Sequence, residues 1–359
     1  MGLPAFNRLT YFWSKSLIFR ARHGFFRLGN YVSHTYRIFS SPRRTTVETL
    51  TRCFQATFLL RAGPTANARI LGCLAKAQQL YDVDLHAFVF MSGHYHLCAT
   101  YDEPEQMALF HGHLNTNLSK EIGRLRDWPG SLFHERYSHV EISDETESQL
   151  GRLKYILAQG CKEGLVASPL DWPGPSSTRA LITGEPIYGE WIDRTAYGKA
   201  LRRGEDVSEQ DFAEILEVKL SPLPALAHLS DQSYRQVISG LVRQIEEDTA
   251  AMHRIEGTRP AGIASVLSRN PKDRPKELKR SPRPWLHAHS NEVREAMRTA
   301  LLMIVAQYAV ASGRFRAGGR HAKFPLHTFP PGLPFVRNPD QKPRKRQAFS
   351  QDVELLEPG

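Results

Sequence analysis

The sequence predicts an α+β fold: a ferredoxin-like βαββαβ domain with an antiparallel sheet, followed by a mainly helical C-terminal region. Three observations predict it. Two strand-like runs, 84–90 and 94–100, are joined by so few residues that they must form a hairpin. Apolar residues recur at helical spacing before and after that hairpin. Beyond about residue 205 the helical pattern dominates.

The first half of the domain reads as strand, helix and hairpin. The run RCFQATFLL (52–60) predicts the first strand, which ends before Gly63-Pro64. A helix of about four turns follows, because the residues after this break keep helical spacing. Its marker positions are Ile70, Leu71, Leu74, Ala75, Gln78 and Tyr81.

The second half adds a helix, a strand and a third helix. SLFHERYSHVEI (131–142) predicts the last strand. We expect Ser143-Asp144 to cap the third helix, which then runs through LGRLKYILAQG to Gly160. Acidic residues in its first turn suit a helix N-terminus. The markers of the second helix are Met107, Phe110, Leu114, Leu118 and Ile122, and the first-turn acids are Glu145 and Glu147.

The chain divides into four predicted parts. PLDWPGPSS (169–177) ends the compact pattern, and two apolar stripes, at 234–245 and 291–311, then mark helices. A basic, Pro-broken loop, SRNPKDRPKELKRSPRP, lies between these stripes. The predicted parts are a basic N-terminal arm (1–46), the βαββαβ domain (47–180), a helical C-terminal domain (181–320) and a Pro-rich basic tail (321–359).

Composition narrows the class of protein. The 359 residues are 41% hydrophobic, which is typical of a globular chain with ample core. A formal net charge of +10 favours an anionic partner, with nucleic acid first. The longest apolar run, ALLMIVAQYAVA near residue 300, is short for a membrane span and contains Gln307, so we expect no membrane partner.

The cysteines and glycines exclude several kinds of chemistry. Four scattered cysteines form no CxxC pair, which indicates reduced structural thiols of a cytosolic protein. The sequence holds neither a GxxxxGK[ST] loop nor a GxGxxG turn, so ATP-driven and nicotinamide chemistry have no support. The N-terminal arm has eight Lys or Arg residues and no acid, and we assign it no function.

Two histidines stand one residue apart in HAFVFMSGHYHLCAT (86–100). Side chains two positions apart on a strand point to one face, so His94 and His96 can converge on one metal ion. The alternative is a pair of surface histidines on a half-exposed strand. HGH at 111–113 has the same spacing on a predicted helix, where the two side chains diverge, and we exclude it.

A tyrosine and an amide lie on the helix after the last strand. Tyr155 and Gln159 are four residues apart and therefore share one helix face. A tyrosine beside a metal site of two histidines and one amide is a nucleophile arrangement. Free tyrosine has a pKa of about 10, so a nearby cation is needed for reaction at neutral pH. Arg152, Lys154 and Lys162 lie within two turns. The alternative is an aromatic buried by an amphipathic helix.

Two blocks of the sequence resemble the single-tyrosine HUH transposases. HAFVFMSGHYHL resembles their MPNHxHL block, and KYILAQGCKEGLVASPLDWPG resembles their YIxxNPVxAGLVxxPxDWPWSS block. The similarity is greatest to the REP-associated tyrosine transposases and the small insertion-sequence transposases. The two blocks occur in the right order, about 60 residues apart, and the resemblance covers roughly residues 45–180.

The resemblance implies an activity and a site. It makes His94 and His96 the HUH pair, Tyr155 the nucleophile and Gln159 the third ligand of Mg²⁺ or Mn²⁺. The implied partner is single-stranded or hairpin DNA, which such enzymes cleave and rejoin through a 5′-phosphotyrosine, and a homodimer is among the implied assemblies. It also implies a bacterial cytoplasmic, nucleoid-associated protein. As candidate DNA contacts we take Lys120, Arg152, Lys154 and Lys162.

The chain also departs from the family pattern. Gln159-Gly160 replaces the usual Asn-Pro, and Ser92-Gly93 replaces Pro-Asn before the first histidine. Three alternatives remain open. A histidine-triad hydrolase would need a third histidine where Cys98 stands, and replication initiators or relaxases often have paired tyrosines. A domesticated hairpin-binding protein without cleavage activity is the third.

Overall fold

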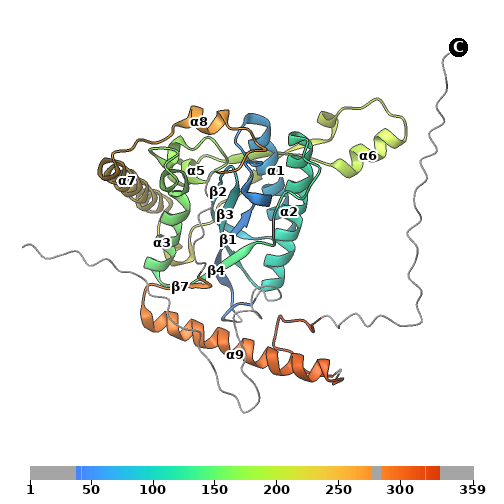
Figure 1. The fold of residues 1–359 in the computed structure, drawn as a ribbon, viewed down its shortest axis with the longest axis vertical. Coiled ribbons are helices and arrows are strands. Elements are labelled where there is room, and N and C mark those ends of the chain that lie inside the picture. The colour runs from blue at the N-terminus through green and yellow to red at the C-terminus, as the bar shows by residue number, and fades with distance from the viewer. Residues whose placement is uncertain (1–37, 42, 276–283, 320, 332–359) are drawn as a thin grey trace, which may run out of the picture.

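The computed structural model describes residues 38–41, 43–275, 284–319 and 321–331. Within them it confirms the predicted α+β class: a sheet with helices is followed by a mainly helical region (Figure 1). Most of the predicted N-terminal arm and most of the predicted basic tail lie outside the described residues.

The main sheet has the strand order β2-β3-β1-β4-β7. Its first four strands are antiparallel neighbours in the ferredoxin-like order, as predicted. The short fifth strand differs from the prediction, because it pairs parallel to β4 and comes from the C-terminal region. The strands are β1 (Thr45–Arg52), β2 (Asp84–Phe90), β3 (His94–Tyr101), β4 (Ser138–Ile142) and β7 (Leu286–His287).

Helices connect and cover these strands. The helices of the βαββαβ unit and the short helices that follow it are α1 (Pro64–Tyr81), α2 (Pro104–Arg126), α3 (Thr146–Leu157), α4 (Gln159–Lys162) and α5 (Thr178–Thr183). Those of the C-terminal region are α6 (Arg194–Arg202), α7 (Asp231–Glu256), α8 (Ile263–Ser268) and α9 (Asn291–Arg316). Single 3₁₀ turns are η2 (Phe54–Ala56), η3 (Pro169–Asp171), η4 (Glu209–Phe212) and η5 (Pro224–Leu226).

Both faces of the main sheet are buried, against different layers. On β3, Tyr95 and Leu97 point into a core shared with α1 and α2. The other face carries His94, His96 and Cys98 and is covered by α3 and α7 (Figure 1). Because successive side chains on a strand alternate between faces, the apolar side of β3 anchors the sheet while its polar side is left for the site.

Three sequence-predicted boundaries were wrong. The first strand is β1, not 52–60, where Gln55 and Ala56 have left-handed φ values of 52° and 58° and the chain makes a 3₁₀ turn. The last strand starts at Ser138, not at residue 131. The third helix starts after Glu145 instead of Ser143-Asp144. The Ser143 hydroxyl donates to the Glu145 carboxylate, and its oxygen accepts no N–H bond from the first turn of the helix.

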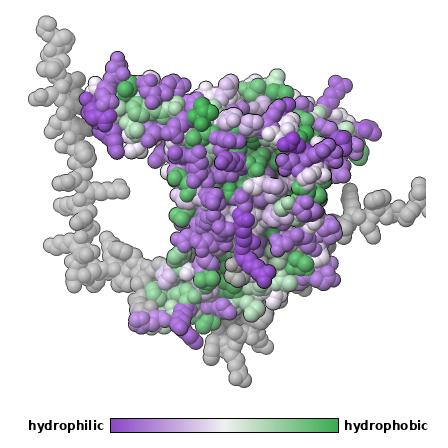
Figure 2. All heavy atoms as spheres, turned by 180° about the vertical axis from the view of Figure 1, so that it is seen from behind, coloured by the Kyte–Doolittle hydropathy of each residue, from purple (hydrophilic) through white to green (hydrophobic). Residues whose placement is uncertain are grey.

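The C-terminal region also holds a two-stranded hairpin, β5 (Ile187–Ile192) and β6 (Ala213–Val218), which the helical pattern did not predict. It crosses α1 where Gly72 meets Gly189; a Cβ on Gly72 would lie 2.1 Å from the backbone oxygen of Glu190. Only glycine allows this approach. Beyond the crossing, α6 projects from the body on a mostly hydrophilic arm, at the upper left in Figure 2.

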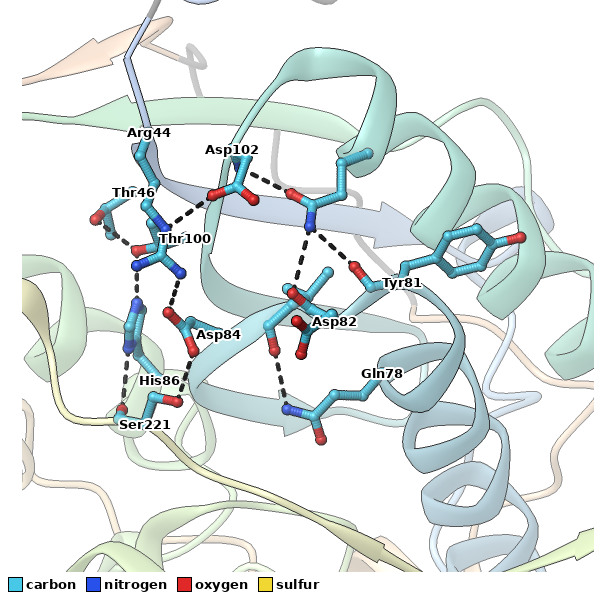
Figure 3. A network of polar contacts seen from close by, with 12 residues as sticks. Arg44, Thr46, Gln78, Tyr81, Asp82, Asp84, His86, Thr100, Asp102 and Ser221 are labelled. Atoms are coloured by element: carbon cyan, nitrogen blue, oxygen red, sulfur yellow. Dashed lines mark hydrogen bonds and ion pairs between the residues drawn. The ribbon is translucent and has the colours of Figure 1, made fainter.

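A polar network ties the hairpin's exit to the edge of the main sheet (Figure 3). The Arg44 guanidinium pairs with Asp84 and, at 2.9 Å, with Asp102. The Ser221 hydroxyl donates to Asp84 at 3.0 Å, and the Ser221 carbonyl lies 3.0 Å from His86 Nδ1. These contacts hold the segment after β6 against β2.

The last helix, α9, runs along the β7 side of the sheet (Figure 1). Its residues Leu301 and Val305 pack against Ile38, and Leu286 of β7 joins them. Among the described residues α9 is the one helix long and apolar enough to cross a membrane, by length and composition only. The sequence-based expectation that every apolar segment is too short for a membrane span therefore does not hold for residues 291–316.

Candidate active site

The two predicted histidines lie at the start of β3 and face α3. Their ring centroids are 5.2 Å apart, with the ring planes at 77°. His96 is 3% exposed, whereas His94, at the first position of the strand, is partly exposed. The strand therefore brings both imidazoles to one face, as the spacing predicted.

A buried carboxylate on the neighbouring strand holds His96. Glu48 of β1 is 2% exposed, and its Oε1 accepts a hydrogen bond from His96 Nδ1 at 2.7 Å. A carboxylate can only accept, so in the neutral ring the proton sits on Nδ1 and Nε2 is the unprotonated nitrogen. The other oxygen of Glu48 pairs with Arg152 from α3. Carboxylates in this position commonly orient and strengthen a metal-binding imidazole.

Tyr155 and Gln159 reach the same place from α3 and α4. The Tyr155 ring lies 5.8 Å from the His96 ring, centroid to centroid, at 75°. Gln159 is 3% exposed, and its Nε2 donates to the Tyr155 carbonyl at 2.9 Å. This bond uses the amide nitrogen, so the amide oxygen is free to turn toward the histidines.

The pKa of His94 is held well below its usual value. Burial is the main cause, and the neighbouring His96 and Arg52 add to it. A side-chain hydrogen bond with Gln159 acts in the opposite direction. His94 is therefore a neutral imidazole at physiological pH, which is the form that binds metals.

The donor set suits a divalent cation. His94 and His96 offer imidazole nitrogens, which suit transition metals, and Gln159 offers a neutral oxygen of the kind that suits Mn²⁺ and Mg²⁺. Among the described residues no group of three or more His, Cys, Asp and Glu side chains is placed to hold a metal ion. The third ligand here would be an amide, so this candidate differs in kind from such clusters.

Two cations lie against the Tyr155 ring. Arg152 Cζ is 4.5 Å and Lys162 Nζ is 4.2 Å from its centroid. Both are cation–π contacts, and they place positive charge beside the candidate nucleophile. Arg152 is also paired with Glu48, and its side chain is mostly buried. It is therefore placed as a structural part of the site and not as an exposed DNA contact.

The other two predicted DNA contacts lie elsewhere. Lys154 turns away from the site and pairs with Asp248 of α7 at 2.8 Å. Lys120 is exposed on α2, which covers the opposite face of the sheet. The structure brings Arg152 and Lys162 to Tyr155 and leaves Lys154 and Lys120 outside the site.

The second sequence block packs directly on the first. Trp172 Nε1 donates to the Phe90 carbonyl at 2.9 Å, and Phe90 N donates to Pro175 at 2.8 Å, just before the turn that leads to His94. A Cβ on Gly160 would lie 2.8 Å from Val166 and 3.1 Å from Trp172. These contacts fix the position of α3, which carries Tyr155, relative to the β2–β3 hairpin, which carries the two histidines.

Other tyrosines and histidines near the sheet are placed away from the site. Tyr95 and Tyr137 lie in the core on the opposite face, and Tyr95 Oη donates to Asn115. His111 contacts the Tyr101 hydroxyl, whereas His113 lies beside Trp191. The two histidines of the HGH segment therefore point to different neighbours.

Sequence reasoning missed Glu48. It falls in TTVETLTR, a polar stretch that does not read as a buried strand although β1 is central in the sheet. The one available signal was the recurrence of Thr and Val, residues that favour strands. Alternation from such a strand would have put Glu48 on one face with Thr46 and Leu50.

No family model and no curated protein matches the chain. Among solved structures, a REP-associated tyrosine transposase bound to a REP hairpin is similar at 19% identity, with 42% of this chain and 86% of that chain covered and a TM-score of 0.33. A candidate transposase from Deinococcus radiodurans R1 is similar at 15% identity, covering 32% and 91%, with a TM-score of 0.25. Similarity at these levels does not by itself establish shared function.

Proposed function

We propose that this chain is a metal-dependent transposase that cleaves and rejoins single-stranded DNA through Tyr155. One observation carries the proposal: the Tyr155 ring faces the His96 ring at 5.8 Å, while Gln159 bonds the Tyr155 backbone and also contacts His94. Two sequence blocks that are 60 residues apart thus meet in one site with a nucleophile and three metal-binding groups.

The chemistry is a phosphodiester exchange. The Tyr155 phenolic oxygen attacks phosphorus, the bond to the 3′ oxygen breaks, and that oxygen leaves as a 3′-OH after gaining a proton. The phenol loses its proton, and Arg152 and Lys162 beside the ring offset the negative charge that develops. Attack by a 3′-OH on the phosphotyrosine reverses the step, so no nucleotide hydrolysis is needed.

A bound Mg²⁺ or Mn²⁺ would polarise the scissile phosphate and offset its charge. His94, His96 and Gln159 would hold it, and Glu48 would keep the His96 ring turned so that Nε2 faces the ion. The residues of the chain then position the strand and the phenol, and the lowered pKa of His94 keeps that imidazole unprotonated.

Covalent capture tests the proposal. Wild-type protein incubated with labelled, hairpin-bearing single strands and Mn²⁺ should give an adduct that survives boiling in detergent, and Tyr155→Phe should abolish it. Tyr188→Phe is a matched control, since Tyr188 is 55% exposed on β5 and so accessible. Hairpin binding without any wild-type adduct would instead establish a non-cleaving DNA-binding protein, and an adduct that persists in Tyr155→Phe would refute the assignment of the nucleophile.

A further inference from the structure

Residues 269–274, the described start of the basic, Pro-broken loop of the C-terminal region, lie near the candidate site. Phe58 N donates to the Asp273 carbonyl at 2.9 Å, and Arg61 donates to the carbonyls of Leu267 and Arg269 at 2.9 and 2.8 Å. A segment more than 200 residues away in the sequence is thereby fastened to the loop that follows β1.

That loop is itself joined to the turn before His94. Cys53 N donates to the Gly93 carbonyl and Leu60 N donates to the Ser92 carbonyl, both at 2.9 Å. The 269–274 segment therefore lies one loop away from the histidine pair.

Five cations gather where these segments meet. We call them the basic rim: Arg61, Arg126, Arg269, Lys272 and Arg274. Arg126 donates to the Leu59 and Arg61 carbonyls, and its pKa is lowered by burial and, next, by the Arg61 guanidinium. Two carboxylates, Asp127 and Asp273, lie among these cations, so the rim keeps a net positive charge.

The rim also presents aromatic rings. The Arg269 guanidinium lies 5.2 Å from the centroid of the partly exposed Phe58 ring. Phe54, on the loop after β1, and His134, on the segment before β4, form an edge-to-face pair 5.9 Å apart, and the His134 side chain is 60% exposed. Cations interleaved with accessible rings suit a single strand, whose unpaired bases can stack while its phosphates are neutralised.

The backbone here is strained as well. Gln55 and Ala56 are consecutive non-glycine residues in the left-handed region, each at a cost of about 1 kcal/mol or more. Arg274 contacts the Gln55 side chain at 3.4 Å. Such strain is retained where neighbouring structure over-determines a loop, and it concentrates at functional sites.

We propose that the basic rim binds the phosphate backbone of the single-stranded DNA that enters the candidate site. This rests on the proposed function for the identity of the strand. It gives the C-terminal region a role in holding substrate, through residues other than those that flank Tyr155.

Binding, measured in a Tyr155→Phe background so that no cleavage occurs, tests the rim. Each phosphate contact on a single strand contributes about 0.7 to the slope of log affinity against log salt. Lys272→Gln/Arg274→Gln should lower that slope by about 1.4 and weaken binding roughly tenfold at 0.15 M salt. The charge-preserving pair Lys272→Arg/Arg274→Lys should keep both values near those of the parent.

A matched pair on the α6 arm controls for overall charge. Lys199→Gln/Arg202→Gln removes two exposed positive charges from the arm and should leave the slope unchanged. An unchanged slope in the rim variant, an equal loss in the α6 variant, or equal competition by duplex DNA would each overturn the rim proposal. None of these results depends on adduct formation, so they are separable from failure of the proposed cleavage.

Discussion

The buried contact between Glu48 and Arg152 gives the most demanding test of the site's architecture. Glu48 and Arg152 side chains are 3% and 12% exposed, and Glu48 also accepts from His96 Nδ1. Removing one partner of a buried ion pair typically costs 3–5 kcal/mol, roughly, because a charge stays buried without its counter-ion. Glu48→Gln keeps an oxygen for His96, so we expect the lower end, about 3 kcal/mol of unfolding free energy.

Urea denaturation measures this cost, with a surface pair as the control. Lys154 and Asp248 lie 2.8 Å apart but are 33% and 70% exposed. Asp248→Asn should therefore cost less than about 1 kcal/mol, since exposed ion pairs contribute little. A second variant, Arg152→Met in the Glu48→Gln background, removes the stranded charge and should recover part of the loss.

Glu48→Gln should also lower the affinity for Mn²⁺, which a change in stability alone would not alter. With the carboxylate replaced by an amide, His96 Nδ1–H loses its charged acceptor, and Mn²⁺ affinity measured by titration calorimetry should fall by about 10- to 100-fold. A Glu48→Gln protein with parental stability and parental Mn²⁺ affinity would falsify the reasoning, because Glu48 would then neither balance Arg152 nor orient His96.

Three further outcomes are expected. Gln159→Ala should weaken Mn²⁺ binding and cleavage but leave DNA affinity almost unchanged, and excess Mn²⁺ should partly restore cleavage. Gln159→Asn should retain some activity. Wild-type metal dependence in Gln159→Ala would mean that the site has only two protein ligands. Gly72→Ala should destabilise the protein by several kcal/mol, roughly, because its Cβ would overlap the Glu190 backbone. Gly112→Ala, whose Cβ would meet no atom within 4 Å, should stabilise α2 by up to about 1 kcal/mol. Thermal or urea melts measure both changes. Burial lowers the pKa of His287 to about 4, so below pH 6.5 the unfolded chain takes up a proton that the native state excludes. The free energy of unfolding should therefore fall as pH drops from 6.5 to 4. His287→Asn should flatten that slope, whereas His134→Asn should not.

The sequence predicted elements best where spacing and burial agree. The β2–β3 hairpin was predicted almost to the residue, because its apolar runs alternate and the turn between them is short. β1 was missed, since its buried face is filled with Thr46 and Glu48 whose partners lie far away in the sequence. Local patterns cannot show that a polar side chain will be buried by a distant partner.

The residues of the candidate site likewise include some features that the sequence predicted and some that it did not. Periodicity predicted that His94 and His96 share one strand face and that Tyr155 and Gln159 share one helix face, and the structure brings the two pairs together. The partners of Arg152 and Lys154 could not be predicted, because buried Glu48 and exposed Asp248 both lie far from these cations in the sequence. The β5–β6 hairpin was also beyond reach, since its strands are 20 residues apart and separated by α6.

The helical region after the βαββαβ unit does more than extend the chain, because it holds the tyrosine helix on its own sheet. Lys154 pairs with Asp248, the Ser168 hydroxyl donates to Glu246 at 2.5 Å, and Gly262 N donates to the Leu165 carbonyl at 2.9 Å. These contacts join α7 and the segment after it to both ends of the block that carries Tyr155. Movement of α3 away from the sheet would therefore require breaking its contacts with α7.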